Sequence, residues 1–323
     1  MGAVNRILIT GASGFVGSAA LRAARDQGIE VIALYRGLPH AAWEDDLGIT
    51  AVKLDLTAAD ATERLSPLVS EVGSIIHAAA HLGDDAAAHD RVTLGGTQAL
   101  LSALENWCGT FVLVSSIAVY DTVALAPGDA LDETCALATA QKARDAYSKA
   151  KLTQEALVQE AMPDAWLIRP GAVWGAGRTW NALLGFWASK VFVQIGKDGA
   201  LPLVHVYHLG ETLIRAAQKE PKGTVSINVV DDDLPDRRRF VSVHKTLTGW
   251  PKFVLPITYD VWLKLARLLR PISAGLPGLF QEPIIRARLM PLRYPNAALR
   301  ATLGGKDHAP FEEMMAQSIA GEP

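Results

Sequence analysis

The sequence is poor in cysteine and in uninterrupted apolar segments, and each shortage excludes a class of protein. Cys108 and Cys135 are the two cysteines among 323 residues, too few for a disulfide framework. Hydrophobic residues make up 50% of the chain, but its strongest apolar runs, 253–257 and 261–269, are broken by proline or charged residues. Neither approaches the roughly 18 apolar residues that a membrane-spanning helix needs. We therefore expect two free thiols and no stable membrane insertion.

An excess of charge of one sign is also lacking. Lys and Arg number 31 and Asp and Glu 34, which gives a formal net charge of −3. Nucleic-acid-binding proteins usually carry a strongly basic face, so we expect no nucleic-acid partner. Residues 1–6 lead into an apolar run without the hydrophobic segment of a signal peptide, which favours a cytoplasmic location.

The apolar residues recur as short runs that alternate with helical patterns. Seven runs have the character of strands buried on both faces, at 6–10, 31–35, 51–54, 74–77, 110–115, 165–169 and 224–230. Helical patterns are found at 14–27, 90–106, 147–160 and within 204–217. Strands that alternate with helices indicate βαβ units and right-handed crossovers. The sequence thus predicts an α/β fold with a doubly wound parallel sheet of about seven strands.

A glycine-rich turn follows the first predicted strand, where residues 10–17 read TGASGFVG. In this G-x-x-G-x-x-G spacing, Gly11 allows a tight turn, Gly14 lets a pyrophosphate approach the backbone, and Gly17 lets helix and strand pack closely. The free N–H groups of the following helix would face the phosphates. The expected cofactor contacts here are Gly11, Ser13, Gly14, Phe15, Val16 and Gly17.

The end of the second predicted strand bears on the choice between NAD and NADP. A carboxylate there would bind the adenosine ribose of NAD, whereas an arginine accommodates the 2′-phosphate of NADP. The sequence has Tyr35-Arg36 and no carboxylate, so NADP(H) is favoured, with NAD(H) as the alternative. A solvated surface arginine is the competing interpretation of Arg36. Asp55, followed by Leu56, is a candidate for the adenine amino group or an ordinary helix cap.

Tyr147 and Lys151 are four residues apart, which places both on one face of a helix. A buried lysine ammonium beside a phenol is expected to lower the phenol's pKa and make it a general acid/base. Ser116 follows the fifth strand, where a hydroxyl can hold a substrate oxygen at the ligand-binding edge of an open sheet. Ser115 competes for that role.

These motifs together resemble the extended branch of the short-chain dehydrogenase/reductase superfamily, which includes nucleotide-sugar epimerases, dihydroflavonol-type reductases and 3β-hydroxysteroid-type dehydrogenases. The resemblance covers nearly the whole length. It is carried by 10–17, Asp55-Leu56, 76–80, 115–120, 147–151, Arg169-Pro170, Gly175, 204–206 and 228–231.

The resemblance implies a Rossmann-type sheet and a role for each motif. Ser116 would be the catalytic serine and Tyr147 the acid/base, while Lys151 would also bind the nicotinamide ribose. Further cofactor contacts would come from Ala78, Ala79, Ala80, Pro170, Ala172 and Val173. Family members often dimerise through the helices expected at 90–106 and 147–160, so we expect a homodimer.

Four places depart from the family pattern, one of which is Tyr207-His208 where the family usually has an acidic pair. Thr93 stands where the family often has Asn, Gly171 where sugar-nucleotide epimerases contact the nucleotide through Asn, and 200–203 lacks their diphosphate-binding Arg. Apolar replacements would leave the charge of a sugar nucleotide unpaired. We therefore favour an NAD(P)-dependent oxidoreductase acting on a carbonyl or hydroxyl carbon of a small organic substrate. A nucleotide-sugar epimerase or dehydratase with retained NAD(P) is the alternative.

Beyond Pro170 the strand–helix alternation stops, which indicates a second domain. We expect an NAD(P)-binding domain of residues 1–172 and 204–232. A smaller, mainly helical substrate domain would comprise residues 173–203 and 233–323. The amphipathic pattern at 259–270 favours packing in that domain, with interfacial membrane contact as a minority alternative.

Substrate contacts are expected from several residues near the predicted catalytic group. These are His81, Ser116, Ile117, Gly171 and Trp174. Trp174, Trp180 and Trp187 would either form an apolar wall of the substrate pocket or pack within the small domain. No metal site is expected, since no zinc-ligand spacing appears.

Overall fold

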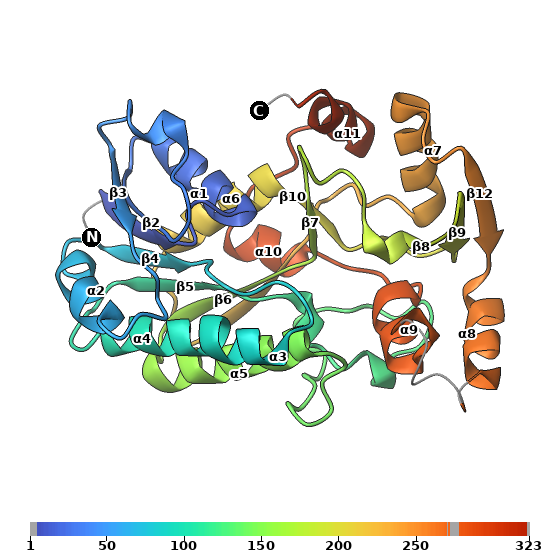
Figure 1. Ribbon diagram of the computed structural model, residues 1–323, viewed down its shortest axis with the longest axis horizontal. Helices are drawn as coiled ribbons and strands as arrows, with labels where there is room; N and C mark the ends of the chain where they lie inside the picture. Colours follow the sequence, from blue (N-terminus) through green and yellow to red (C-terminus); the bar gives the residue numbers. More distant parts are fainter. Residues whose placement is uncertain (1–4, 270, 272–277, 322–323) are drawn as a thin grey trace.

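The computed structural model describes residues 5–269, 271 and 278–321, and has two parts that lie side by side (Figure 1). The larger part contains a seven-stranded sheet in which every pairing is parallel, in the order β11-β6-β5-β4-β1-β2-β3. Its strands are β1 (Arg6–Thr10), β2 (Glu30–Tyr35), β3 (Ile49–Lys53), β4 (Ser74–His77), β5 (Thr110–Val114), β6 (Ala165–Pro170) and β11 (Val225–Val229). The predicted α/β, Rossmann-type sheet is confirmed.

Helices cover both faces of this sheet, because its strands are apolar on both sides. Ile7 and Ile9 of β1 pack toward α1 (Phe15–Asp26) and α6 (Val206–Ala217). Leu8 belongs to the opposite layer, with α2 (Ala61–Val69), α4 (Gly96–Ser102) and α5 (Ala146–Ala161). All three side chains are fully buried, and each such burial stabilises the fold by about 1.5–3 kcal/mol.

The helix expected at 90–106 has a different form. A short α3 (Ala86–Ala88) leads into a π-helical segment, His89–Gly95, before α4 begins at Gly96 and ends at Ser102. Adjacent glycines at 95 and 96, after Val92 and Thr93, weaken the preference for a regular α-helix here. The helix α2 between β3 and β4 was not predicted.

The smaller part is mainly helical, as the sequence suggested, and it also contains two small sheets that were not predicted. It contains a three-stranded sheet, β12-β9-β8, formed by Gly185–Ala188 (β8), Val191–Ile195 (β9) and Phe253–Ile257 (β12). A two-stranded sheet joins β7 (Ala172–Trp174) to β10 (Leu203–His205). Its helices are α7 (Arg237–Thr248), α8 (Tyr259–Leu268), α9 (Glu282–Leu289) and α11 (Phe311–Ala320), whereas α10 (Ala297–Thr302) packs against β11 of the large sheet.

Short 3-10 helices complete the described elements, at Ala41–Trp43, Ile117–Val119, Thr122–Ala124, Ala182–Leu184 and Gly278–Phe280. Cys108 and Cys135 are free thiols. No helix within the described ranges is long and apolar enough to cross a bilayer.

Candidate active site

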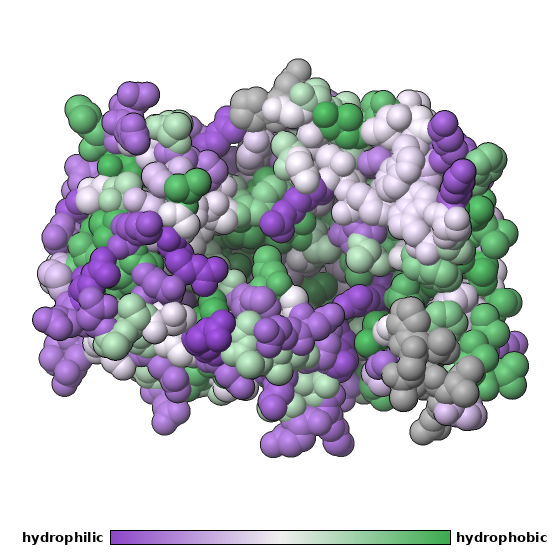
Figure 2. Space-filling model, viewed as in Figure 1, coloured by the Kyte–Doolittle hydropathy of each residue, from purple (hydrophilic) through white to green (hydrophobic). Residues whose placement is uncertain are grey.

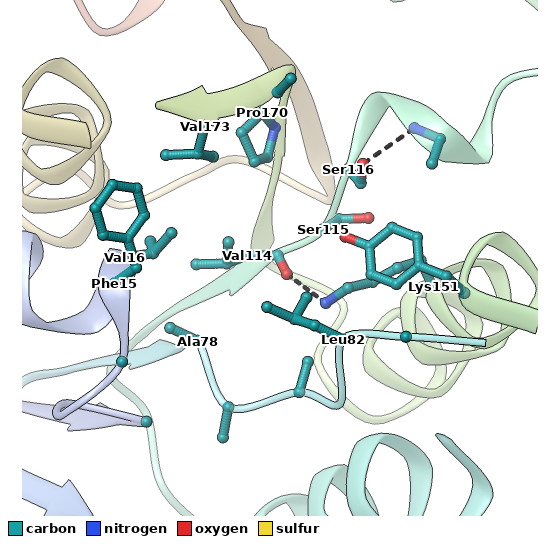
Figure 3. A pocket seen from close by; sticks show the side chains of 18 of the residues that line it. Phe15, Val16, Ala78, Leu82, Val114, Ser115, Ser116, Lys151, Pro170 and Val173 are labelled. Atoms are coloured by element: carbon teal, nitrogen blue, oxygen red, sulfur yellow. Dashed lines mark hydrogen bonds between the residues drawn. The ribbon is translucent and has the colours of Figure 1, made fainter. Parts of the chain in front are cut away.

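A cavity of about 810 Å³ lies at the carboxyl ends of the parallel strands, between the two parts of the molecule (Figures 2 and 3). This is the edge at which open α/β sheets bind ligands, and the volume is typical of cofactor and substrate pockets. Every residue predicted to bind cofactor or to act in catalysis lines it. So do two of the predicted substrate residues outside that group, Ile117 and Gly171.

The glycine turn is shaped by close contacts of its backbone. Gly11 has φ of 66°, and a Cβ there would lie 3.0 Å from backbone atoms of Ala79. A Cβ on Gly17 would lie 2.2 Å from the carbonyl oxygen of Gly11. Helix α1 begins at Phe15 with no side-chain N-cap and no acidic residue in its first turn. Its first N–H groups are therefore available to an anion in the cavity.

The far end of the cavity presents Tyr35, Arg36 and Asp55. Arg36 is exposed, and among the described residues it makes no hydrogen bond or ion pair. The Asp55 carboxylate accepts hydrogen bonds from the backbone N–H and the hydroxyl of Thr57, both at 2.9 Å. These bonds lower the pKa of Asp55. Asp55 thus caps a local turn while also lining the cavity.

Lys151 is buried beneath the cavity, with 4% of its surface exposed. Its Nζ donates to the carbonyl oxygen of Val114 at 2.8 Å (Figure 3). It also donates to Oε1 of Gln154 at 2.8 Å. Burial lowers the pKa of Lys151 to about 8, so the ammonium form predominates at neutral pH.

The pKa of Tyr147 differs in direction from the sequence expectation. Burial raises it, and a hydrogen bond with Ser116 and the charge of Arg144 only partly offset that effect. Lys151 is not among the groups that lower the pKa of Tyr147; its ammonium is hydrogen-bonded to Val114 and Gln154. The Tyr147 phenol is consequently protonated at neutral pH and can act as a proton donor.

The two candidate serines have different partners. Ser115 Oγ donates to Oε1 of Glu155 at 2.5 Å, and Glu155 forms a buried ion pair with Arg169 at 2.8 Å. Ser116 Oγ accepts the N–H of Ala118 at 3.1 Å and interacts with the Tyr147 phenol. Ser115 is therefore tied to the buried ion pair, whereas the Ser116 hydroxyl lies beside the Tyr147 phenol.

A buried polar chain connects Lys151 to the glycine turn, and sequence reasoning missed it. Gln154 Nε2 donates to Thr97 Oγ1 at 2.8 Å, and Thr97 lies 2.9 Å from Nε2 of His77. His77 Nδ1 is in turn 2.7 Å from the hydroxyl of Thr10. Burial lowers the pKa of His77 to about 3, so this ring is neutral. The spacing of Gln154 from Lys151 along one helix was the available signal.

Two predicted substrate residues, His81 and Trp174, do not line the cavity. Neighbouring side chains of a strand point to opposite sides, so Val173 faces the cavity while Trp174 enters the small part's core. The Trp174 indole donates to Asp231 at 3.2 Å. His81 instead packs its ring against His89, 4.8 Å between centroids.

Trp180 and Trp187 belong to an aromatic cluster around Trp250, with ring centroids 4.5 and 4.7 Å from that residue. Neither lines the cavity. These two tryptophans therefore pack within the small part and do not form a wall of the cavity.

The substrate end of the cavity contains charged residues that sequence reasoning did not single out. Arg144 Nε donates to Asp145 at 3.3 Å, and Arg288 lies 3.9 Å from the same carboxylate. Asp145 also accepts the N–H of Ser148 and caps α5. Two guanidinium groups thus share one carboxylate, which leaves positive charge facing the cavity. Tyr294 lies at the same end.

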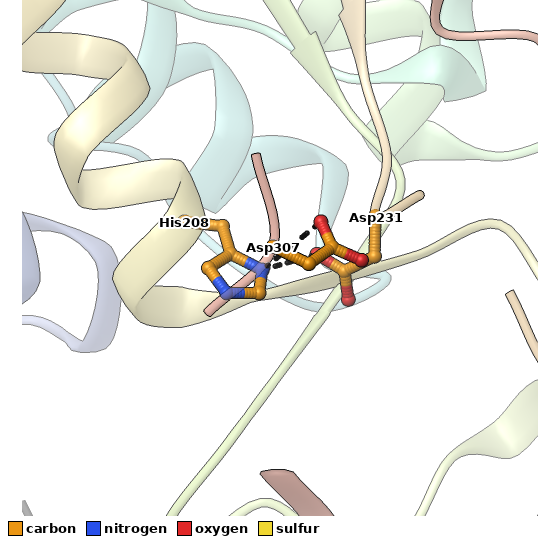
Figure 4. Close-up of side chains that lie close together, drawn as sticks. All are labelled: His208, Asp231 and Asp307. Atoms are coloured by element: carbon orange, nitrogen blue, oxygen red, sulfur yellow. Dashed lines mark hydrogen bonds and ion pairs between the residues drawn. The ribbon is translucent and has the colours of Figure 1, made fainter. Parts of the chain in front are cut away.

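A second cluster, His208, Asp231 and Asp307, brings together side chains of the metal-ligand type (Figure 4). His208 Nδ1 lies 2.8 Å from Asp231, and Nε2 accepts the N–H of His308 at 2.9 Å. Burial acts to lower the pKa of His208, but the hydrogen bond and charge of Asp231 outweigh it and raise the pKa. Both ring nitrogens of His208 are hydrogen-bonded, so the cluster links α6 to the part of the chain that follows β11.

Comparison with known proteins places this site in a family. Residues 7–194 match the model of the NAD dependent epimerase/dehydratase family. A ceramide reductase from Caulobacter vibrioides is 27% identical over 235 residues, which cover 70% of this chain and 65% of that protein. The match thus spans less than two thirds of the relative's length.

Solved structures share the fold along nearly the whole chain. MoeE5 in complex with UDP-glucose and NAD superposes with a TM-score of 0.70 at 18% identity, covering 98% of each chain. The terminal R domain of the myxalamid PKS-NRPS pathway gives 0.71 at 18% identity, covering 99% of this chain and 91% of its own. UDP-glucose 4-epimerase from Bifidobacterium longum gives 0.68 at 16%, covering 97% of each. The family match, which extends over more than half of the sequence, identifies the chain as a member of the NAD dependent epimerase/dehydratase family.

Proposed function

We propose that this chain is an NADP(H)-dependent oxidoreductase that reduces a carbonyl carbon, or oxidises the corresponding alcohol, in a small organic substrate. The observation that carries the proposal is the meeting of Ser116, Tyr147 and Lys151 at the end of β5, in the cavity that also contains the glycine turn. Membership of an NAD-dependent family supports it.

The residues of the glycine turn fit a dinucleotide. The backbone at Gly11 and Gly17 occupies space that a Cβ would fill, and the first N–H groups of α1 have no side-chain partner at the N-cap. Those N–H groups would hold the pyrophosphate. The nicotinamide supplies the hydride chemistry when bound, while the protein supplies orientation and proton transfer.

Tyr147 would donate the proton to the substrate oxygen during reduction. Its raised pKa keeps the phenol protonated at neutral pH, and Ser116 would hydrogen-bond the same oxygen. The Lys151 ammonium would bind the nicotinamide ribose. Reduction is therefore the direction that these protonation states favour.

NADP(H) is the cofactor we favour because of the end of β2. Arg36 lines the cavity there without a partner among the described residues, and no carboxylate occupies the equivalent place. A guanidinium binds a 2′-phosphate well, because charge-assisted bonds to phosphate are strong. The solved neighbours named above with bound NAD keep NAD(H) as the alternative.

The substrate we propose has an apolar body and a polar group beside the carbonyl. Ile117, Leu131, Leu183 and Ala287 form an apolar wall of the cavity, and Arg144 and Tyr294 supply polar contacts. The relative named as a ceramide reductase supports a lipid-like carbonyl compound.

A sugar-nucleotide epimerase is the second candidate, and a specific observation favours it. Arg144 and Arg288 leave uncompensated positive charge at the substrate end, which suits a diphosphate. Solved neighbours in complex with UDP-glucose or UDP-glucuronic acid support this candidate.

Net cofactor change separates the two candidates. NADPH fluorescence is followed with long-chain ketones and, in parallel, UDP-glucose conversion is followed by chromatography. The oxidoreductase consumes NADPH in proportion to the alcohol formed. Conversion of UDP-glucose with no net change in nicotinamide would instead establish the epimerase and overturn our proposal.

We also propose the domain division 1–172 with 204–232 and 173–203 with 233–323, and a homodimer formed through α4 and α5. The first is supported by β11, which returns to the large sheet after the chain has formed β8 and β9. The second rests on the family resemblance. The protein would then bind its small-molecule ligands and a second copy of the chain.

A further inference from the structure

Helix α8 is apolar on two sides, which is unusual for a helix at the surface. One side is buried in the small part's core through Tyr259, Trp262, Leu263 and Ala266. The other side carries Val261, Leu265 and Leu268, which are 57%, 38% and 76% exposed. A surface helix ordinarily presents polar residues outward, so packing within the chain explains only half of this sequence.

The neighbouring strand β12 extends the exposed apolar surface. Phe253 and Leu255 are 63% and 51% exposed, and Trp250, just before the strand, is 39% exposed. β12 is an edge strand and leads directly into α8. Figure 2 shows hydrophobic residues along the margin where Figure 1 places β12 and α8. We call Trp250, Phe253, Leu255, Val261, Leu265 and Leu268 the apolar face.

Positive charge accompanies the apolar face. Residues 245–268 hold three lysines and one arginine against one aspartate, a net charge of +3 in a chain whose net charge is −3. Arg267 is paired with Glu282 at 2.6 Å, whereas Lys252 and Lys264 are exposed and have no carboxylate partner in the described ranges. The occupant of this face should therefore be apolar and anionic at once.

We propose that the apolar face docks on an anionic phospholipid surface. Aromatic and aliphatic side chains interleaved with lysines suit the boundary between acyl chains and phosphate headgroups. A second copy of the chain fits less well, because two-fold pairing would bring the same lysines together. Addition of a peptide strand to β12 is opposed by Pro256, which has no backbone N–H to donate.

The apolar face lies one helix away from the cavity. α8 packs against α9, and α9 contributes Ala287 and Arg288 to the cavity lining. Docking through α8 would therefore hold the substrate end of the cavity close to the membrane surface. The docking proposal does not depend on the proposed reaction, since vesicle binding requires neither cofactor nor substrate.

Vesicle flotation of the full chain tests the proposal. The probes are phosphatidylcholine vesicles with and without phosphatidylglycerol. The test variant carries both Leu265→Asp and Leu268→Asp, and the control variant carries Leu47→Asp. Leu47 is 103% exposed and lies between β2 and β3 on the other part of the molecule, so it offers the same chemical change away from the apolar face.

The wild type and Leu47→Asp should float with the anionic vesicles and bind neutral ones more weakly, with added salt reducing the binding. The double variant should lose about tenfold or more of its binding, because two leucines no longer enter the acyl region. Absence of wild-type binding, or equal loss in Leu47→Asp, would overturn the proposal. The proposal would also be overturned if sedimentation velocity found dimers of the wild type and of Leu47→Asp but monomers of the double variant. That result would mean that a second copy of the chain covers the apolar face.

Discussion

Arg36 is the residue on which cofactor choice should depend. Its guanidinium is exposed at the end of β2, without a partner among the described residues. We predict that Arg36→Ala weakens NADPH binding by about tenfold or more, because a charge-assisted bond is worth about 1.5–3 kcal/mol, and leaves NADH binding nearly unchanged. Fluorescence titration with both nucleotides measures this, with Arg22→Ala on the outer side of α1 as the control. Equal weakening of both nucleotides would show that Arg36 does not hold the 2′-phosphate.

Lys151 predicts a dependence of stability on pH. Burial lowers its pKa to about 8 from 10.5, so between these values the unfolded chain binds a proton that the folded chain has released. The free energy of unfolding should rise with pH in this window, by at most about 1.4 kcal/mol per pH unit. Denaturant unfolding of the wild type and of Lys151→Met, compared at several pH values from neutral to alkaline, isolates this contribution. A difference between the two proteins that stays constant with pH would contradict it.

At the scale of single residues, sequence reasoning identified groups with strong local signals and missed groups defined by packing. Tyr147 and Lys151 were predictable from helical spacing, and both line the cavity. The direction in which the pKa of Tyr147 shifts was not predictable from the sequence, because it depends on burial and on where the Lys151 ammonium points. Trp174 was misplaced because one position along β7 reverses the side that a residue faces.

Helix α5 is held against the sheet by a buried ion pair. Glu155 of α5 and Arg169 of β6 are 3% and 4% exposed and joined at 2.8 and 2.9 Å. We predict that Glu155→Ala destabilises the fold by about 3–5 kcal/mol, because it leaves an uncompensated buried guanidinium. Glu160→Ala, on the exposed surface of the same helix, should change stability by less than about 0.5 kcal/mol. Similar unfolding midpoints in urea for both variants would contradict this role.

At the scale of elements, the seven-stranded sheet was predictable because most of its strands are short apolar runs and helical patterns lie between several of them. The three-stranded sheet of the small part was not. Its β9 pairs with β12, and β10, α6, β11 and α7 lie between them in sequence. Runs such as 253–257 have the composition of strands, but pairing between such distant segments leaves no local pattern to read.

The whole molecule divides its apolar excess among three places. Part is the sheet covered on both faces, part is the cavity wall, and part is the apolar face on β12 and α8. Periodicity left the last open, because the amphipathic pattern at 259–270 allowed either packing in the small domain or contact with a membrane surface. Helix α8 therefore has two apolar sides, of which one is buried in the small part and the other is exposed.

We predict a homodimer at micromolar concentration through α4 and α5, which lie on the same side of the large sheet (Figure 1). Sedimentation velocity should give twice the mass of 34.6 kDa for the wild type. It should give the same for the apolar-face double variant, since that face lies on a different part of the molecule. A monomer mass for the wild type would contradict the dimer.

The central claim is that Tyr147 protonates the substrate oxygen as hydride leaves NADPH. The most direct test is mass spectrometry of the alcohol product formed with NADPH in which both hydrogens at C4 of the nicotinamide are replaced by deuterium. We predict one deuterium on the carbinol carbon for each NADPH oxidised by the wild type and by the control Tyr207→Phe. Labelled product should fall by about a hundredfold or more in Tyr147→Phe, because a positioned acid contributes about 10²–10⁴ in rate. Unlabelled product, or equal labelled product from Tyr147→Phe, would contradict the account.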